Sequence, residues 1–143
     1  MTNMDNAALA RRLYEAFNGG DLASAAAMAS EDIQVDLVPM RHMFRGREEF
    51  KEGFMGGFKR AFPDIHLKVI NQVSNGDYVV NECTWSGRHT GPLAGPNGDI
   101  EPTGKSVVDA RICEVWRFDS GRLSRLTNYQ DVGTWMRQLG LAP

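Results

Sequence analysis

The sequence has few of the residues on which metal and disulfide sites depend. Its 143 residues include only two cysteines and three histidines, and neither Cys83 nor Cys113 belongs to a CxxC pair. No zinc-binding pattern is therefore present. Both cysteines lie in strand-like runs, so we expect buried free thiols, as in a reducing cytoplasm.

An excess of one charge is also missing. Sixteen Lys and Arg residues oppose 18 Asp and Glu residues, which gives a net charge of −2 and no reason to expect nucleic acid or an anionic membrane as a partner. No apolar run approaches the ~18 residues of a membrane span, and no apolar signal segment opens the chain. GxGxxG, P-loop and GxSxG motifs are absent. We expect one soluble cytoplasmic domain over residues 1–143.

What the sequence does contain is enough apolar material for a core, since 42% of its residues are hydrophobic. Helical spacing of Leu9, Leu13 and Phe17 predicts a first helix with Asp5 as its N-cap. Phe50, Phe54 and Phe58 recur at i+4 and predict an aromatic stripe on a later helix. The helices are expected at residues 5–18, 21–29, 47–62 and 132–139.

The second half of the sequence alternates apolar and polar residues and predicts strands. Asn75-Gly76 is a strong hairpin signal, because both residue types tolerate a positive φ angle. The strands are expected at residues 33–38, 65–73, 78–90, 107–118 and 123–129, with a loop at 91–104. Helices followed by antiparallel hairpins indicate an α+β fold, in which helices pack on one face of a curved sheet that encloses a pocket.

Five stretches of the sequence together resemble the SnoaL-like polyketide cyclases of the nuclear transport factor 2-like superfamily. They are residues 13–21, the G-R-E-E-F run at 46–50, G-R-H-T-G at 87–91, P-T-G-K at 102–105, and the tail from Trp116 to Gly140. The resemblance covers almost the whole chain. It implies an α+β cone with three N-terminal helices on a curved antiparallel sheet, and a homodimer through the convex sheet face.

The resemblance also implies a reaction. Members with a known role close a ring in a polyketide methyl ester by an aldol step, without metal or cofactor, using one acid/base aspartate. The corresponding position here is Asn128, whose amide cannot act as a general base. Either another carboxylate supplies the base, or the chemistry differs, or there is none. Asn128 could still donate a hydrogen bond to an enolate oxygen.

Glu114 is our candidate for the missing base. Strand alternation predicts that it shares a face with Val108, Ala110, Ile112, Trp116 and Phe118. Desolvation among apolar neighbours would raise the pKa of this carboxyl group and suit it to proton abstraction near neutral pH. The alternative is a structural role in a pair with a basic residue across the sheet. Asn128 is expected to share a face with Leu126 and Ser124, and to approach Glu114 across the hairpin.

Histidines and aromatic residues complete the predicted site. His89 is expected on the face of Cys83 and Trp85, and the resemblance puts a histidine near the pocket, where it would stabilise an enolate; the alternative is a loop-edge histidine. His42 is expected near the pocket mouth, or simply at the surface. The candidate substrate-binding residues are Tyr14, Phe17, His42, Phe54, Phe58, Trp85 and Trp116. For most of the Tyr, Phe and Trp residues, plain core is the favoured alternative.

Three functions remain open at this point. The first is a cofactor-free enzyme for a polyketide-like or aromatic carbonyl substrate, with Glu114 as base and with Asn128 and His89 at the enolate oxygen. The second is non-catalytic binding of a small apolar ligand. The third is a cofactor-free hydroxylase or hydrolase on the same scaffold. The Asp109-x-Arg111 pair resembles the carboxylate–arginine sites of cone-shaped epoxide hydrolases, but it is expected on the strand face opposite Glu114. Asp36, Asp109 and Asp131 are the reserve carboxylates.

Overall fold

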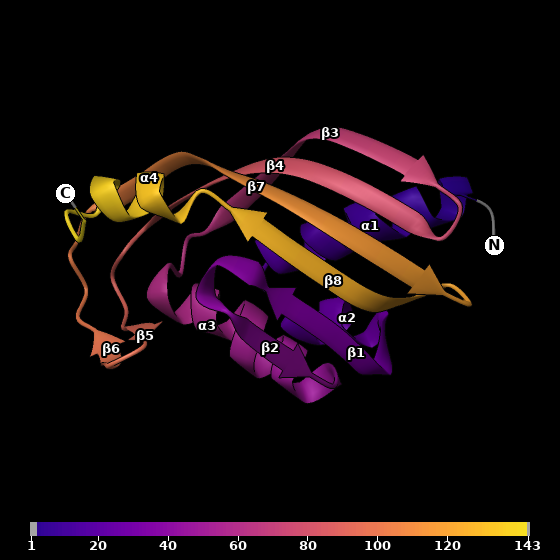
Figure 1. Cartoon of the computed structure of the whole chain (residues 1–143), viewed down its shortest axis with the longest axis horizontal. Helices are drawn as coiled ribbons and strands as arrows, with labels where there is room; N and C mark the ends of the chain where they lie inside the picture. Colours follow the sequence, from indigo (N-terminus) through magenta and orange to yellow (C-terminus); the bar gives the residue numbers. More distant parts are fainter. Residues whose placement is uncertain (1–2, 143) are drawn as a thin grey trace.

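The computed structural model describes residues 3–142 as one curved six-stranded sheet with helices packed on it (Figure 1). The order of the strands across the sheet is β2-β1-β8-β7-β4-β3. A two-stranded sheet, β5-β6, lies beside α3. The elements are α1 (Asn3–Asn18), α2 (Leu22–Ala27), β1 (Ala29–Leu37), η1 (Val38–Met40), β2 (His42–Arg45), η2 (Glu49–Met55), α3 (Gly56–Ala61), β3 (His66–Asn75), β4 (Tyr78–Arg88), β5 (Leu93–Gly95), β6 (Gly98–Ile100), β7 (Ser106–Asp119), β8 (Arg122–Gln130) and α4 (Val132–Gln138).

The sheet confirms the predicted α+β cone. Strands β3, β4, β7 and β8 form the antiparallel hairpins expected from the turns, and Gly76 and Gly121 at those turns adopt positive φ angles. The exception to the antiparallel order is β1, which returns from the N-terminal helices and pairs parallel to β8. Helix α1 packs against β3 and β4, so the predicted pocket lies between the helices and the sheet.

A β-bulge near the start of β7 corrects one predicted face. The pairing of β4 with β7 shifts register between Trp85 and Gly87, and Asp109 adopts a positive φ of 50°. As a result Val107 is buried, whereas Val108 is 57% exposed, although simple alternation placed Val108 on the inner face. Beyond the bulge the alternation holds, and Ala110 to Phe118 keep their predicted sides.

A second bulge changes the predicted neighbours of Asn128. The pairing of β7 with β8 shifts between Arg117 and Phe118. Leu123 is buried in consequence, while the Ser124 hydroxyl donates a hydrogen bond to the carbonyl oxygen of Arg117. Ser124 therefore does not share the inner face of Leu126 and Asn128, as alternation had predicted.

The predicted third helix is partly a π-helix. Element η2 has the wider π-helical turn, and the Gly56 N–H donates to the carbonyl oxygen of Lys51, five residues earlier. A Cβ atom at Gly53 would lie 2.9 Å from the ring of Phe44, so a glycine is needed for this close packing on β2. π-Helical turns occur often at functional sites, and this one carries Phe50 and Phe54.

Other boundaries differ modestly from those predicted. Helix α1 begins at Asn3, so Asp5 lies inside the helix rather than at its N-cap. Strand β2 and the small β5-β6 hairpin were not predicted. Asp131, one of the reserve carboxylates, is the N-cap of α4, because its carboxylate accepts a hydrogen bond from the Thr134 backbone N–H at 3.1 Å.

Cys83 is a buried free thiol, and Cys113 is a half-buried one. Burial raises the pKa of the Cys83 thiol to about 12, so it stays protonated. Within residues 3–142, no helix has the length and apolar character needed to cross a membrane. In the same part of the chain, no three His, Cys, Asp or Glu side chains gather as metal ligands.

Candidate active site

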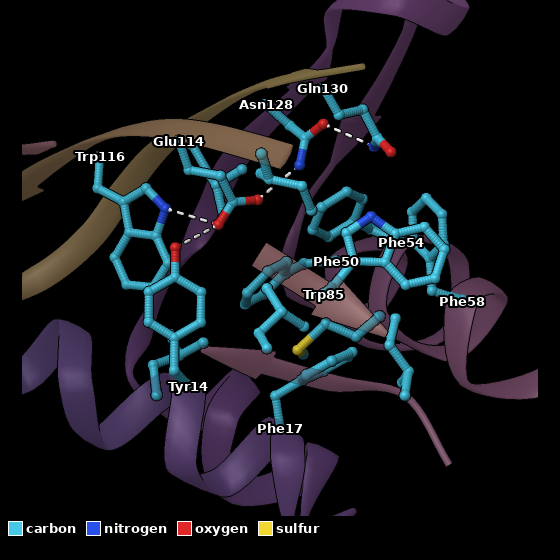
Figure 2. A pocket seen from close by; sticks show the side chains of 16 residues that line it. Tyr14, Phe17, Phe50, Phe54, Phe58, Trp85, Glu114, Trp116, Asn128 and Gln130 are labelled. Atoms are coloured by element: carbon cyan, nitrogen blue, oxygen red, sulfur yellow. Dashed lines mark hydrogen bonds between the residues drawn. The ribbon is translucent and has the colours of Figure 1, made fainter. Parts of the chain in front are cut away.

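A cavity of about 50 Å³ lies between the concave face of the sheet and helices α1, η2 and α3. Its wall is mostly apolar and rich in aromatic side chains (Figure 2). All six aromatic residues predicted to bind substrate line it, and Phe50 joins them. Its polar side chains are those of Tyr14, Glu114, Asn128 and Gln130, and the indole rings of Trp85 and Trp116 also line it.

Among the described residues, Glu114 is the one carboxylate in the wall of this cavity, and it is only 3% exposed. Three donors hold its two oxygens, as Figure 2 shows. The Tyr14 hydroxyl donates to Oε1 at 2.6 Å, and the Trp116 Nε1–H donates to the same oxygen at 3.2 Å. Asn128 Nδ2 donates to Oε2 at 2.7 Å. The carboxylate is therefore held in one orientation from two strands and a helix.

The electrostatics of the cavity favour a tuned base. None of the Lys, Arg or His side chains of the described chain lines it, and the three groups that donate to Glu114 are neutral. Burial raises the pKa of this carboxyl group, and the three hydrogen bonds oppose part of that rise. Burial also raises the pKa of Tyr14, with Glu114 adding to the rise, so the Tyr14 hydroxyl keeps its proton and remains a donor.

Asn128 lies directly across the hairpin from Glu114, which confirms the predicted approach. Its amide is engaged at both ends. Nδ2 donates to Glu114, and Oδ1 accepts a hydrogen bond from Gln130 Nε2 at 2.9 Å. Asn128 therefore holds the carboxylate in place, and its oxygen turns away from it.

Trp135, on helix α4 outside the cavity, decides which way these amides face. Its Nε1–H donates to Gln130 Oε1 at 2.9 Å, and an indole nitrogen can only donate. Gln130 must therefore turn its NH₂ group to Asn128, and Asn128 must turn its own NH₂ group to Glu114. The hydrogen bonds therefore run in one direction, from Trp135 through Gln130 and Asn128 to Glu114. The last of them is donated to Glu114 and favours its ionised form.

Replacing Trp135 by phenylalanine should raise the pKa of Glu114. Without the indole donor both amides can turn round, and Asn128 Oδ1 can then accept a hydrogen bond from protonated Glu114. We expect a rise of about half a unit to one unit, the equivalent of one neutral hydrogen bond. Titration of the Glu114 carboxyl carbon by ¹³C NMR measures it. Phe62→Leu is the control, because Phe62 packs on Trp135 but leaves its donor intact. An equal rise in both variants would contradict this role.

His89 lies outside this constellation. It is buried and follows β4, but it does not line the cavity. Its Nδ1 accepts a hydrogen bond from the Thr103 backbone N–H at 3.1 Å, and its ring packs against Phe62 at 5.3 Å. Burial lowers the pKa of His89, which favours the neutral ring. The histidine thus joins the end of β4 to the P-T-G-K segment.

The remaining predicted polar residues also lie elsewhere. His42 is exposed on β2 with its ring against Phe44, and it does not line the cavity. Asp36 is 3.8 Å from the guanidinium of Arg125 in an ion pair outside the cavity. Asp109 is exposed at the bulge.

Sequence reasoning missed Phe50, Gln130 and Trp135. Phe50 belongs to the i+4 series that pointed to Phe54 and Phe58, and Gln130 continues the alternation of Leu126 and Asn128 along β8. These patterns could have identified both residues. Trp135 has no such signal, because its contact with Gln130 depends on how α4 turns back after Asp131.

Comparison with known proteins agrees with this architecture. IdmH, a candidate polyketide cyclase from Streptomyces antibioticus, superposes with a TM-score of 0.77 at 26% identity, over 94% of this chain and 98% of its own. AclR, a candidate hydroxylase from Streptomyces galilaeus, gives 0.81 at 24% identity, over 99% of this chain and 89% of its own.

A candidate SnoaL-like polyketide cyclase from Jannaschia sp. CCS1 gives a TM-score of 0.84 at 20% identity, over 98% of this chain and 94% of its own. No functionally curated protein matches the sequence. The family model of the SnoaL-like polyketide cyclases matches residues 7–139. The chain therefore belongs to the SnoaL-like polyketide cyclase family.

Proposed function

We propose that this protein removes a proton from the carbon next to a carbonyl group in a small aromatic or polyketide-like compound, with Glu114 as the general base and without a cofactor. The observation that carries the proposal is the position of Glu114. It is a buried carboxylate with a raised pKa, in a cavity rich in aromatic side chains that no Lys, Arg or His of residues 3–142 lines. Such a group combines access to an apolar substrate with enough basicity to accept a proton.

The reaction follows from this arrangement. Glu114 takes the α-proton, and the electron pair of the C–H bond moves into an enolate whose charge lies on the carbonyl oxygen. In a ring closure the enolate carbon then bonds to a second carbonyl carbon of the same molecule. The new alkoxide oxygen takes the proton back from Glu114, so the enzyme ends in its starting state. This is the aldol-type step of the family.

The roles of the other predicted residues change with the geometry. Asn128 was expected to hold the enolate oxygen, but its amide is engaged with Glu114 and Gln130. We therefore propose that it orients the base. We give His89 no part in the reaction, because it does not line the cavity.

The size of the cavity limits how a substrate enters. Small-molecule pockets usually measure about 300–1,000 Å³, and this one measures about 50 Å³. An aromatic substrate therefore requires the side chains of the wall to move apart. Phe58 is half-buried and follows the π-helical turn, so we propose that it moves when a ligand enters.

The rival function is non-catalytic binding of a small apolar ligand in the same cavity. Asn128, at the position where the resemblance implies the acid/base aspartate, favours it. A cofactor-free hydroxylation is the further alternative, since the fold is shared with a candidate hydroxylase. In both alternatives the ligand would bind in the same cavity. They differ from our proposal because the α-protons of the ligand would not be removed.

Exchange of α-protons with solvent deuterium tests the proposal without knowledge of the final product. A panel of aromatic ketones and β-keto esters would be incubated with the protein in D₂O, and loss of the α-proton signal followed by ¹H NMR. We expect exchange above the buffer rate for at least one member. Compounds that bind without exchange would support the rival function. Hydroxylated or hydrolysed products would point to the other alternative.

We also propose that a second copy of this chain covers the outer face of the sheet. Val73, Val80, Val115 and Thr127 form one row across four strands of that face, and Val73 is 55% exposed. An uncovered apolar row of this kind suits a symmetric contact. Sedimentation velocity should show a dimer that Val115→Lys converts to monomer; a monomeric wild type at tens of micromolar would refute the contact.

A further inference from the structure

Trp85 carries a buried donor that nothing in the described part of the chain satisfies. Its indole Nε1–H has no hydrogen-bond partner among residues 3–142. The other two tryptophans do have acceptors, because Trp116 donates to Glu114 and Trp135 donates to Gln130. A buried donor without a partner costs about 1–3 kcal/mol, so native proteins rarely keep one without a use.

The indole ring of Trp85 is held so that it cannot turn to find a partner. It is 1% exposed. Phe62 and Trp135 pack against it edge to face at 5.0 Å and 5.8 Å and hold it in place, whereas the ring of Phe58, which we propose moves when a ligand enters, lies farther away at 6.4 Å. A ring fixed in this way presents its N–H in a constant position, which is the arrangement expected of a preorganised binding group.

Trp85 lines the same cavity as Glu114. In Figure 2 it stands on the opposite side of the pocket from Tyr14 and Trp116, so a ligand would lie between Trp85 and the carboxylate. Each of the other side-chain donors of the wall already makes a hydrogen bond: Tyr14, Trp116 and Asn128 donate to Glu114, and Gln130 donates to Asn128. Among the described residues that line the cavity, Trp85 is therefore the one whose side-chain donor makes no hydrogen bond.

We propose that the Trp85 Nε1–H binds the carbonyl oxygen of the ligand, with the ligand's apolar body in the aromatic cavity and its α-carbon turned to Glu114. A neutral donor in a cavity without cations suits a neutral oxygen better than a carboxylate. If the carbon is deprotonated, negative charge develops on that same oxygen, and a fixed N–H in a dry site stabilises it. The catalytic part of this inference rests on the proposed function, whereas the binding part does not.

Indole N–H signals in ¹H–¹⁵N NMR spectra test the contact directly. The three tryptophans give three such signals, and Trp85→Phe identifies the one from Trp85. The probes are acetophenone and α-methylstyrene, which share a planar shape while only acetophenone has an oxygen. We expect acetophenone to shift the Trp85 proton downfield more than those of Trp116 and Trp135, and we expect α-methylstyrene to produce no such shift.

Affinities provide the second measurement. Trp85→Phe should weaken binding of acetophenone about three- to tenfold, the equivalent of one neutral hydrogen bond, and change binding of α-methylstyrene by less than twofold. If Trp85→Phe does not fold, the wild-type shifts decide alone, with the signals assigned from Trp116→Phe and Trp135→Phe.

Equal shifts with both probes would overturn the inference, as would equal losses of affinity or the absence of acetophenone binding at millimolar concentration. The two proposals fail separately. A selective Trp85 shift without α-proton exchange would keep the carbonyl site and remove the catalytic function. Exchange without a Trp85 shift would keep the function and remove this donor.

Discussion

Replacing Glu114 by glutamine should slow α-proton exchange by about 10²- to 10⁴-fold, the usual contribution of a general base. The amide has nearly the same shape but cannot accept the proton. The loss should appear in kcat more than in KM, because the apolar wall that binds the substrate is unchanged. Exchange rates of wild type and variant in D₂O measure the effect.

Two other carboxylates provide matched controls for that change. Asp36 is partly exposed beside Arg125, and Asp109 is exposed at the bulge of β7. Asp36→Asn and Asp109→Asn should leave the exchange rate within about twofold, since surface substitutions rarely alter more than local interactions. Retention of wild-type activity in Glu114→Gln, or its loss in either control, would place the base elsewhere.

Glu114→Gln also introduces a hydrogen-bond conflict that the variant's fold must survive. Tyr14 and Trp116 both donate to Oε1, so the glutamine oxygen belongs there and its NH₂ group faces the NH₂ group of Asn128. Asn128 cannot turn, because Gln130 holds its oxygen. The circular dichroism spectrum and urea unfolding of the variant must therefore be compared with those of wild type before a loss of activity is assigned to the base.

Asn128→Asp should give the largest dependence of stability on pH. The new carboxylate would face Glu114 Oε2, which now lies 2.7 Å from Asn128 Nδ2. Two buried carboxylates at that distance cannot both ionise, so the pair keeps one proton to a higher pH than either group alone. Gln130 Nε2 can still donate to one oxygen of the new residue.

The sign of this effect follows from proton uptake. In the unfolded chain both carboxyl groups lose their protons near pH 4. In the folded variant one proton stays on, so the folded state binds more protons above that pH. The free energy of unfolding therefore falls as pH rises, by about 1.4 kcal/mol for each unit by which the pKa of the pair is raised. The raised pKa of wild-type Glu114 gives a smaller fall of the same sign.

Urea unfolding between pH 5 and pH 8 measures both slopes. Asn75→Asp is the control, because Asn75 is an exposed residue at the β3–β4 turn, and its pH profile should follow wild type. Parallel profiles for Asn128→Asp and wild type would show that the two carboxyl groups do not interact as the geometry requires.

Combining the two substitutions should restore part of the lost stability. In Glu114→Gln/Asn128→Asp, the glutamine NH₂ group faces a carboxylate, so the hydrogen-bond conflict and the charge repulsion both disappear. The double variant should unfold at higher urea concentration than Asn128→Asp at pH 8. In this double variant the carboxylate of the cavity is at position 128, where the resemblance implies the family's acid/base aspartate. Any exchange activity of the double variant therefore reports on a base at that position.

Much of the site could be predicted because it lies on regular strands. Glu114, Trp116, Leu126 and Asn128 follow the two-residue period, and one hairpin turn places the two strands together. The two bulges could not be predicted, because they depend on local backbone shifts such as the positive φ of Asp109. For this reason the predicted faces of Val108 and Ser124 were wrong.

Residues off the regular pattern were harder to place. His89 has the alternation and the motif of a pocket residue, yet it lies past the end of β4 and is bound by Thr103. The direction of the hydrogen bonds between the Gln130 and Asn128 side chains depends on Trp135, whose contact with Gln130 is set by the packing of α4. Hydrogen-bond direction of this kind follows from tertiary structure and has no signature in the sequence.

The central claim is that Glu114 is a tuned base, and its own titration tests this most directly. The carboxyl ¹³C signal of Glu114, assigned by its loss in Glu114→Gln, would be followed against pH alongside the rate of α-proton exchange. We predict that Glu114 titrates above the ordinary pKa of glutamate and that the exchange rate rises through the same pKa. A Glu114 that titrates at or below the ordinary value, or an exchange rate that ignores its titration, would contradict the account.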